Sequence, residues 1–298
     1  MLAEAVRALG AQLGEPEGPP EALDGGITNR NYRVRWSGRD CVLRIPGRDT
    51  AVLGIARDAE LAAARAAAAL GIAPEVVAYE PRHGCLVTAY VDGRPLDPAA
   101  LRARLPEIAA ALRRFHAGGP LPSRFDAFAV AADYLRIARE RGGAIPPAAP
   151  ALVAAARRIR DALTGPEHAP VPCHDDLLAA NLLHDGERLW IVDWEYAGMG
   201  DRYFDLGNLA VNNELGEDDE ERLLAAYWGE PATPRRLAAL RLMRIASSLR
   251  EGMWGVVQGA VSELEFDFAG YAAEHLEHAR AALADPRLGA WLEVTRGG

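Results

Sequence analysis

Apolar and polar residues alternate along the first part of the chain, as they do in strands. Val34 and Trp36 alternate with arginines, the letters SGRD then supply a turn, and the run CVLRI resumes an extended pattern. This arrangement predicts a β-hairpin, and the stretch PEVVAYEPRHGCLVTAYVDG predicts two further strands. An alanine-rich segment between them, ended by Gly71 and Pro74, predicts a helix. We expect residues 1–92 to form a small antiparallel sheet lobe with an N-terminal helix and this inserted helix.

From residue 93 onward the apolar positions recur with a helical period. Asp97 and Pro98 are good N-cap and first-turn residues for a helix that reaches about His116. Further helices are expected near residues 126–141, 150–163, 217–228, 234–260 and 266–284. The predicted fold class is therefore α+β, with the small sheet lobe followed by a larger, mainly helical lobe over residues 93–298.

Composition limits the chemistry that is open to this chain. All 33 basic residues are arginine, which excludes a Schiff-base mechanism and a Walker A loop because both need a lysine amine. A net charge of −9 argues against a nucleic-acid partner. Three single cysteines, no leader segment and no apolar run of membrane-spanning length lead us to expect a cytoplasmic protein without membrane partners. We expect a monomer or a homodimer that binds small molecules.

One stretch, residues 171–198, places many polar residues beside short apolar runs. Asp176 is followed by Asn181, and the apolar letters LWIV lead directly into Asp193. Carboxylate and amide oxygens are the ligands that Mg²⁺ prefers, and this ion takes its remaining ligands from water and from substrate phosphates. One of the acids stays free of metal in such an arrangement, and it can act as a general base toward a substrate hydroxyl.

The letters HDDLLAANLL, followed by IVDWE, resemble the catalytic loop and metal-binding segment of kinase-fold small-molecule phosphotransferases. The HxDxxxxN spacing is that of the aminoglycoside phosphotransferase and choline kinase superfamily. The resemblance implies a protein-kinase-like two-lobed fold, with ATP and Mg²⁺ as cofactors. It also implies three catalytic residues, with Asp176 as the base and with Asn181 and Asp193 as Mg²⁺ ligands. His174 would then be the structural histidine of the loop, and Asp205 would brace the loop.

The small lobe contains candidate residues for binding the nucleotide. A glycine-containing loop before a strand lets backbone approach the phosphates, and polar side chains add donors. The candidate loop residues are Gly26, Thr28 and Asn29. Arg44 lies where kinase-like folds place a basic residue, and Glu60 on the following helix is placed to pair with it. The backbone around Tyr90 and Asp92 is expected to contact adenine.

The letters DWEYAGMGDRYFDLGNLAVNN and EGMWGVVQGAVSELEFDFAGYA extend the resemblance to choline and ethanolamine kinases, over most of residues 24–280. It implies transfer of the γ-phosphoryl group of ATP to the hydroxyl of choline or ethanolamine, whose ammonium group lies against aromatic faces. The residues implied around this acceptor are Glu195, Tyr196, Glu251, Trp254 and Tyr271. Glu251 replaces a second pocket tryptophan of the eukaryotic choline kinases, and Asn212 replaces an acid. A carboxylate in the pocket suits a primary ammonium such as that of ethanolamine.

Two alternatives remain open at this point. An aminoglycoside kinase, or another alcohol kinase of the superfamily such as a thiamine kinase, would use the same catalytic groups. An inactive kinase-like binding module is disfavoured, because the base, the metal ligands and the cation Arg44 are all retained. Arginine at position 44 is typical of choline-kinase-like enzymes, although a chain without lysine would carry arginine there in any case.

Overall fold

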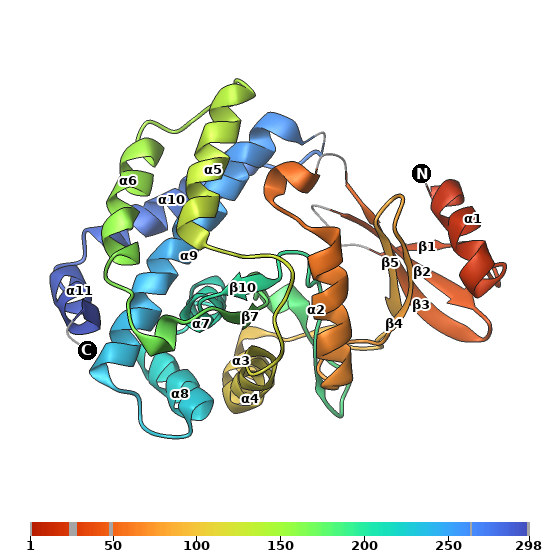
Figure 1. Cartoon of the computed structure of the whole chain (residues 1–298), viewed down its shortest axis with the longest axis horizontal. Helices are drawn as coiled ribbons and strands as arrows, with labels where there is room; N and C mark the ends of the chain where they lie inside the picture. Colours follow the sequence, from red (N-terminus) through yellow and green to blue (C-terminus); the bar gives the residue numbers. More distant parts are fainter. Residues whose placement is uncertain (1, 24–28, 48–49, 263, 297–298) are drawn as a thin grey trace.

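The computed structural model describes residues 2–23, 29–47, 50–262 and 264–296 and shows two lobes (Figure 1). Gly26 and Thr28, both expected in the phosphate loop, lie outside the described residues. The smaller lobe contains a five-stranded antiparallel sheet in the order β1-β2-β3-β5-β4. These strands are β1 (Glu21–Leu23), β2 (Asn29–Trp36), β3 (Arg39–Pro46), β4 (Val76–Glu80) and β5 (Cys85–Ala89).

The predicted hairpin is present as β2 and β3. Its turn residues Ser37 and Gly38 both have positive φ angles, 49° and 77°, as the two-residue turns that match the twist of a hairpin require. The alternating residues Val34 and Trp36 are buried. They pack in one cluster with Leu9 of helix α1 (Leu2–Leu13), which lies on the outer side of the sheet (Figure 1). Helix α2 (Arg57–Ala69) lies on the side that faces the larger lobe (Figure 1).

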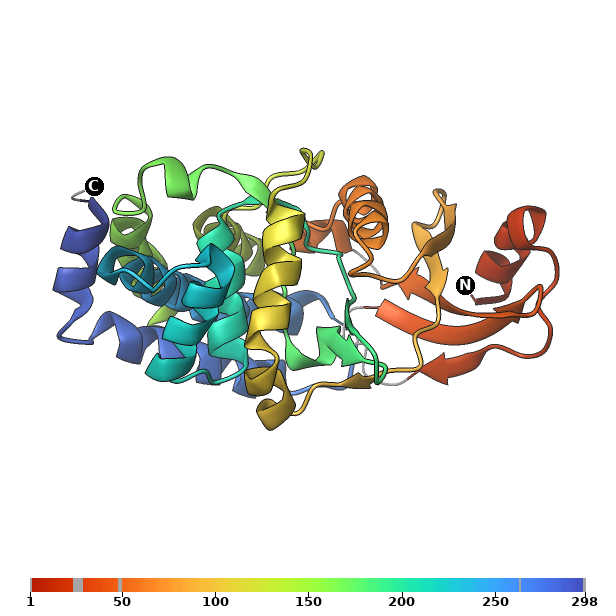
Figure 2. The same ribbon diagram turned by 90° about the horizontal axis from the view of Figure 1, so that it is seen from below.

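The larger lobe is mainly helical, and Figure 2 shows it extending away from the sheet to the C-terminal helices. Its helices are α3 (Pro98–Ala103), α4 (Leu105–His116), α5 (Ala127–Glu140), α6 (Ala149–Arg160), α7 (Arg202–Asn212), α8 (Glu217–Trp228), α9 (Pro234–Val261), α10 (Phe268–Leu283) and α11 (Leu288–Arg296). Short strands frame the polar stretch: β6 (Arg94–Pro95), β7 (Val171–Cys173), β8 (Leu182–His184), β9 (Leu189–Ile191) and β10 (Gly198–Gly200). Within the described residues, every helix is too short or too polar to span a bilayer.

The structure differs from the periodicity analysis at three helices. The single helix expected from Asp97 to His116 is two helices, because Arg104 leaves the helical conformation (φ −101°, ψ 10°) just before Pro106 begins a new first turn. Helix α7 was not predicted; eight consecutive residues from 203 to 210 are buried, and its polar residues Asp205 and Asn208 face the loop of residues 174–177 instead of solvent. Helix α11 was not predicted either.

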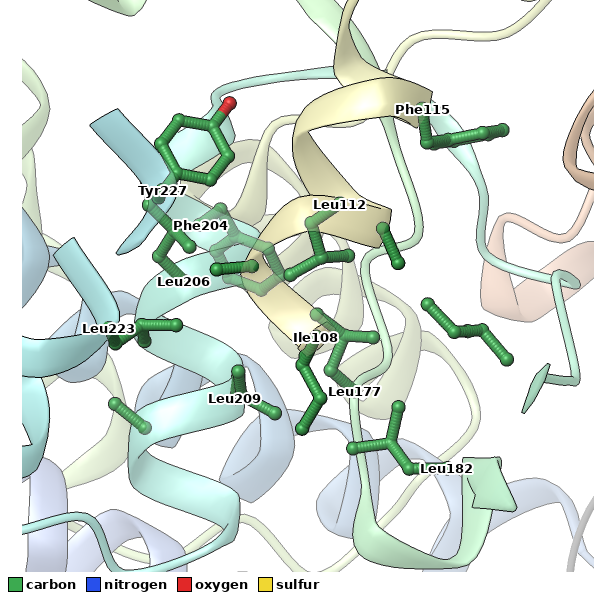
Figure 3. Packing of buried hydrophobic residues seen from close by; sticks show 14 of the residues in the cluster. Ile108, Leu112, Phe115, Leu177, Leu182, Phe204, Leu206, Leu209, Leu223 and Tyr227 are labelled. Atoms are coloured by element: carbon green, nitrogen blue, oxygen red, sulfur yellow. The ribbon is translucent and has the colours of Figure 1, made fainter. Parts of the chain in front are cut away.

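The core of the larger lobe holds the polar stretch in place. Leu177 and Leu182 flank the motif and are fully buried against α4 and α7 (Figure 3). Ile108 of α4 and Leu209 of α7 lie in the same cluster (Figure 3). The apolar runs therefore anchor the backbone in the core, and the polar residues between them receive fixed positions.

Gly207 lets α7 and α9 approach closely. A Cβ added there would lie 2.9 Å from the backbone nitrogen of Arg244 and from the carbonyl carbon of Met243. We expect Gly207→Ala to lower the free energy of unfolding by about 1–3 kcal/mol, as overpacked cores do, measured by urea denaturation. Gly10→Ala is the matched control, because a Cβ there meets nothing within 4 Å and should stabilise α1 by about 0.5–1 kcal/mol. Equal effects of the two changes would contradict this account of the contact.

Candidate active site

The carboxylate of Asp205 on helix α7 holds the loop that begins at His174. Asp205 accepts hydrogen bonds from the backbone N–H groups of His174 at 2.9 Å and Asp175 at 2.7 Å. It also accepts one from Nε2 of His116 at 2.9 Å, and Nδ1 of His116 accepts from the Tyr227 hydroxyl at 2.7 Å. The placement of Asp205 agrees with the expected brace. Sequence reasoning assigned no role to His116, because its partners lie 89 and 111 residues away along the chain.

His174 connects the two halves of the motif. Its Nε2 donates to the carbonyl of Val192 at 2.9 Å, directly before Asp193. Its Nδ1 accepts from the backbone N–H of Asp176 at 3.2 Å. Burial lowers the pKa of His174, so the ring is neutral, as these two hydrogen bonds require. The histidine expected to be structural thus lies between the base and the metal-ligand segment.

A second α7 side chain supports the loop. The Asn208 side-chain oxygen accepts from the backbone N–H of Leu177, and its Nδ2 donates to the hydroxyl of Ser247 on α9 at 2.9 Å. Nδ2 of Asn213 donates to the carbonyl of Leu177 at 3.1 Å. All of these side chains are buried. The loop backbone is therefore held by α7, and α7 is held by α9.

The donor set at Asn181 and Asp193 fits a magnesium ion. Nδ2 of Asn181 donates to the carbonyl of Asp176 at 2.9 Å, and its side-chain oxygen has no hydrogen-bond partner among the described residues. Oδ1 of Asp193 is buried and likewise lacks a partner in the described part of the chain. Burial raises the pKa of Asp193 well above its usual range, Glu195 adds to this rise, and Arg44 opposes it. A buried carboxylate oxygen without a partner and an amide oxygen are ligands that Mg²⁺ prefers.

Asp176 has the surroundings of a general base. It is 9% exposed, and its Oδ1 lies 3.3 Å from Nη1 of Arg250. Burial raises the pKa of Asp176 to about 7, while the neighbouring Arg250 opposes the rise. A base of this strength can accept a proton near neutral pH. Asp175 and Asp193 both have positive φ angles, 68° and 61°, in the strained region that often marks functional sites.

The expected cation of the phosphate side is in place. Arg44 on β3 forms an ion pair with Glu60 on α2, and both side chains are buried. Asp193 lies within electrostatic reach of both Arg44 and Asp176. Arg44, Asp176 and Asp193 are far apart in the sequence but lie in one region of the structure, and their roles toward a nucleotide stay predictions.

Glu195, expected beside the acceptor, contacts the small lobe and also lines one cavity together with Tyr196. Its carboxylate accepts from Nδ2 of Asn29 at 2.8 Å and from Nη1 of Arg57 at 3.3 Å, and it lies 3.6 Å from Nη1 of Arg44. Arg57 also donates to Glu60 at 2.8 Å. These contacts all involve one oxygen of the carboxylate, Oε2, and a contact of Glu195 with the acceptor stays a prediction. Asn29, expected at the phosphates, uses its amide on Glu195.

The segment expected to contact adenine follows β5. The backbone N–H of Tyr90 donates to the carbonyl of Asp40 at 3.0 Å, and the guanidinium of Arg33 lies 4.3 Å from the centre of the Tyr90 ring. That N–H is thus already used by the sheet. Asp92 is exposed. Contact of adenine with the remaining backbone of this segment stays a prediction.

The other expected acceptor residues come together from three segments. Nε1 of Trp254 donates to the Tyr196 hydroxyl at 2.9 Å. The Trp254 and Tyr271 rings meet edge to face with centroids 5.5 Å apart, and the Tyr271 hydroxyl donates to Glu251 at 2.9 Å. Tyr196 also lines a cavity of about 330 Å³. Sequence reasoning missed Arg250, which contacts both Tyr196 and Glu251. The sequence feature that could have revealed it is the pair of charged letters RE in a largely apolar part of α9.

Comparisons with known proteins identify the family and the fold of this chain. Residues 20–240 match the model of the phosphotransferase enzyme family. Ethanolamine kinase 2 of Mus musculus is 28% identical over 279 residues, which cover 83% of this chain and 71% of that protein. A choline/ethanolamine kinase family protein from Mesorhizobium loti has a crystal structure with a TM-score of 0.83 and 33% identity, covering 100% of each chain. Choline kinase LicA from Streptococcus pneumoniae shares the fold, with a TM-score of 0.78 and 22% identity over 95% of this chain and 99% of that chain.

These similarities confirm the protein-kinase-like α+β fold that the motif implied, with its small antiparallel sheet lobe and its larger helical lobe. The chain belongs to the phosphotransferase enzyme family and, within it, to the choline/ethanolamine kinase family, and it is a phosphotransferase that acts on an alcohol group.

Proposed function

We propose that this protein is an ATP- and Mg²⁺-dependent kinase that phosphorylates the hydroxyl of a small amino-alcohol, choline or ethanolamine. The observation that carries the proposal is the position of Asp176. Asp176 is buried and lies within electrostatic reach of Asp193, and Arg250 contacts both Asp176 and Tyr196, whose hydroxyl accepts from Trp254. The relatives add support, because they include an ethanolamine kinase and a LicA structure in complex with AMP.

The proposed reaction assigns a task to each of these residues. Asp176 accepts the proton of the acceptor hydroxyl as its oxygen forms a bond to the γ-phosphorus. The bond between that phosphorus and the bridging oxygen breaks, and ADP leaves. Asn181 and Asp193 would hold Mg²⁺, which supplies positive charge to the phosphates when it is bound. Arg44, oriented by Glu60, supplies further positive charge on the phosphate side.

A panel of acceptors tests this proposal. Choline, ethanolamine, thiamine and an aminoglycoside are each incubated with the enzyme and Mg-ATP, and ADP release is measured. We expect the highest kcat/KM with an amino-alcohol. A higher value with thiamine or the aminoglycoside would favour another alcohol kinase of the superfamily, and no acceptor-dependent ADP release would favour a binding module.

Substitution of Arg44 separates the need for a charge from the need for an arginine. Arg44→Met should raise the KM for ATP about 10- to 100-fold, because a charge-assisted contact to the phosphates is lost and buried Glu60 keeps only one of its two arginine partners, Arg57. Arg44→Lys keeps the positive charge but loses the planar fork with which arginine binds two oxygens at once. The KM for ATP of this variant should therefore lie between those of the wild type and Arg44→Met. Steady-state kinetics at saturating acceptor measure both values. An unchanged KM in Arg44→Met would contradict the phosphate-side role.

A further inference from the structure

The acceptor residues surround a cation that belongs to the protein itself. Arg250 is 1% exposed, and its Nη1 lies 2.6 Å from Oε1 of Glu251 and 3.3 Å from Oδ1 of Asp176. Water does not screen charges at this depth, so each contact has a large effect on the local potential. The resemblance to choline and ethanolamine kinases did not identify this residue.

The guanidinium of Arg250 occupies one aromatic face of the pocket. Its central carbon lies 4.2 Å from the centre of the Tyr196 ring. An ammonium group gains attraction from an aromatic face only when it lies directly over that face. Because Arg250 already lies over Tyr196, a positively charged acceptor cannot use this face while the arginine remains there.

Glu251 is already paired as well. Its Oε1 accepts from Arg250, and its Oε2 accepts from the Tyr271 hydroxyl at 2.9 Å. Glu251 is 3% exposed, so this pairing takes place away from solvent. An approaching ammonium group would therefore meet a neutral Arg–Glu pair instead of a free carboxylate, and the attraction expected from Glu251 is largely cancelled.

We propose that Arg250 is a specificity-determining residue that occupies the cation position of the acceptor pocket, so that the enzyme selects its acceptor by hydroxyl and carbon skeleton more than by positive charge. This inference rests on the proposed function, which places the acceptor hydroxyl at Asp176. It concerns only how the pocket discriminates among alcohols of similar shape. Glu251, which the sequence offered as a partner for a substrate ammonium, serves instead as the partner of Arg250.

A pair of isosteric acceptors tests the proposal. Choline and 3,3-dimethylbutan-1-ol have the same shape, but the second has a neutral carbon where choline has a charged nitrogen. The measured quantity is the ratio of their affinities, choline over the neutral alcohol, obtained by titration calorimetry with a non-hydrolysable Mg-ATP analogue present. The same ratio is taken from kcat/KM where turnover occurs. Effects on folding, on ATP binding or on the base act on both acceptors alike and cancel in the ratio.

Three variants give distinct expected results. The wild type should prefer choline by less than about tenfold, and Arg250→Met should raise the ratio about 10- to 100-fold by freeing Glu251 and the Tyr196 face. Arg250→Lys keeps the positive charge and should stay close to the wild type. Glu251→Gln leaves Arg250 with only its longer contact to Asp176 and should lower the ratio about tenfold, which tests the proposal even if Arg250→Met does not fold. Arg136→Met, at an exposed ion pair on α5, is the matched control and should leave the ratio unchanged.

Two results would overturn the inference: a wild-type preference for choline above about a thousandfold, or a ratio that stays constant in both Arg250→Met and Glu251→Gln. Failure of the proposed function has a different signature, namely that the wild type phosphorylates no amino-alcohol with Mg-ATP. The calorimetric ratio still reports the charge preference of the pocket in that case.

Discussion

Asp176→Asn should lower kcat by about 10²–10⁴-fold, the range that a positioned general base contributes. Asparagine has the same shape as aspartate but cannot take the hydroxyl proton. The surrounding structure should survive the change, because Arg250 keeps its ion pair with Glu251 at 2.6 Å and loses only the longer contact to residue 176. Single-turnover and steady-state kinetics measure the loss, and equilibrium titration should show ATP affinity within roughly threefold of the wild type.

Asp285→Asn provides the control for that experiment. This residue lies between α10 and α11 and pairs with Arg287 at 2.9 Å, far along the chain from the motif. We expect kcat to stay at the wild-type value in this variant. A normal kcat in Asp176→Asn would refute the assignment of the base. A loss confined to KM would instead assign Asp176 to binding.

Asp205→Asn should lower the free energy of unfolding by about 3–5 kcal/mol, because hydrogen bonds to a buried charged group contribute about 1.5–3 kcal/mol each and more than one of them is affected. The carboxylate accepts from two backbone N–H groups and from His116, and all of these partners are buried. An asparagine amide would turn an N–H₂ group toward at least one of these donors and leave it unsatisfied. Urea denaturation followed by circular dichroism measures the change.

Asp97→Asn is the matched substitution at an exposed site. Asp97 caps α3 by accepting from the backbone N–H of Ala100 at 2.8 Å, and asparagine caps helices about as well as aspartate does. Its stability should change by no more than a few tenths of a kcal/mol. If the two variants lost equal stability, the network around Asp205 would not be the source of the effect.

Local patterns predicted those parts of the molecule whose determinants are close in sequence. The alternation at Val34 and Trp36 identified the β2–β3 hairpin, because one face of that sheet is buried and the other is not. The spacing of Asp176 and Asn181 predicted a catalytic loop, because both residues belong to one short segment. The Arg44–Glu60 pair also followed from chain order and was found in the structure.

Determinants that are far apart in sequence could not be predicted in this way. His116 acquires its role from Asp205 and Tyr227, and Glu195 turns to Asn29 and Arg57, because tertiary packing alone brings these groups together. Helix α7 was missed for a related reason, since its polar residues Asp205 and Asn208 are buried against a loop that is distant in sequence.

The length of α9 has a consequence for how such an enzyme can change. This 28-residue helix contributes Ser247 to the support of the loop and Arg250, Glu251 and Trp254 to the acceptor pocket, all within about two turns. A rigid-body shift of the helix would displace Ser247, which supports the loop that carries Asp176. It would move the proposed acceptor residues at the same time. New acceptors are therefore more accessible through exchange of individual side chains on this helix than through movement of its backbone.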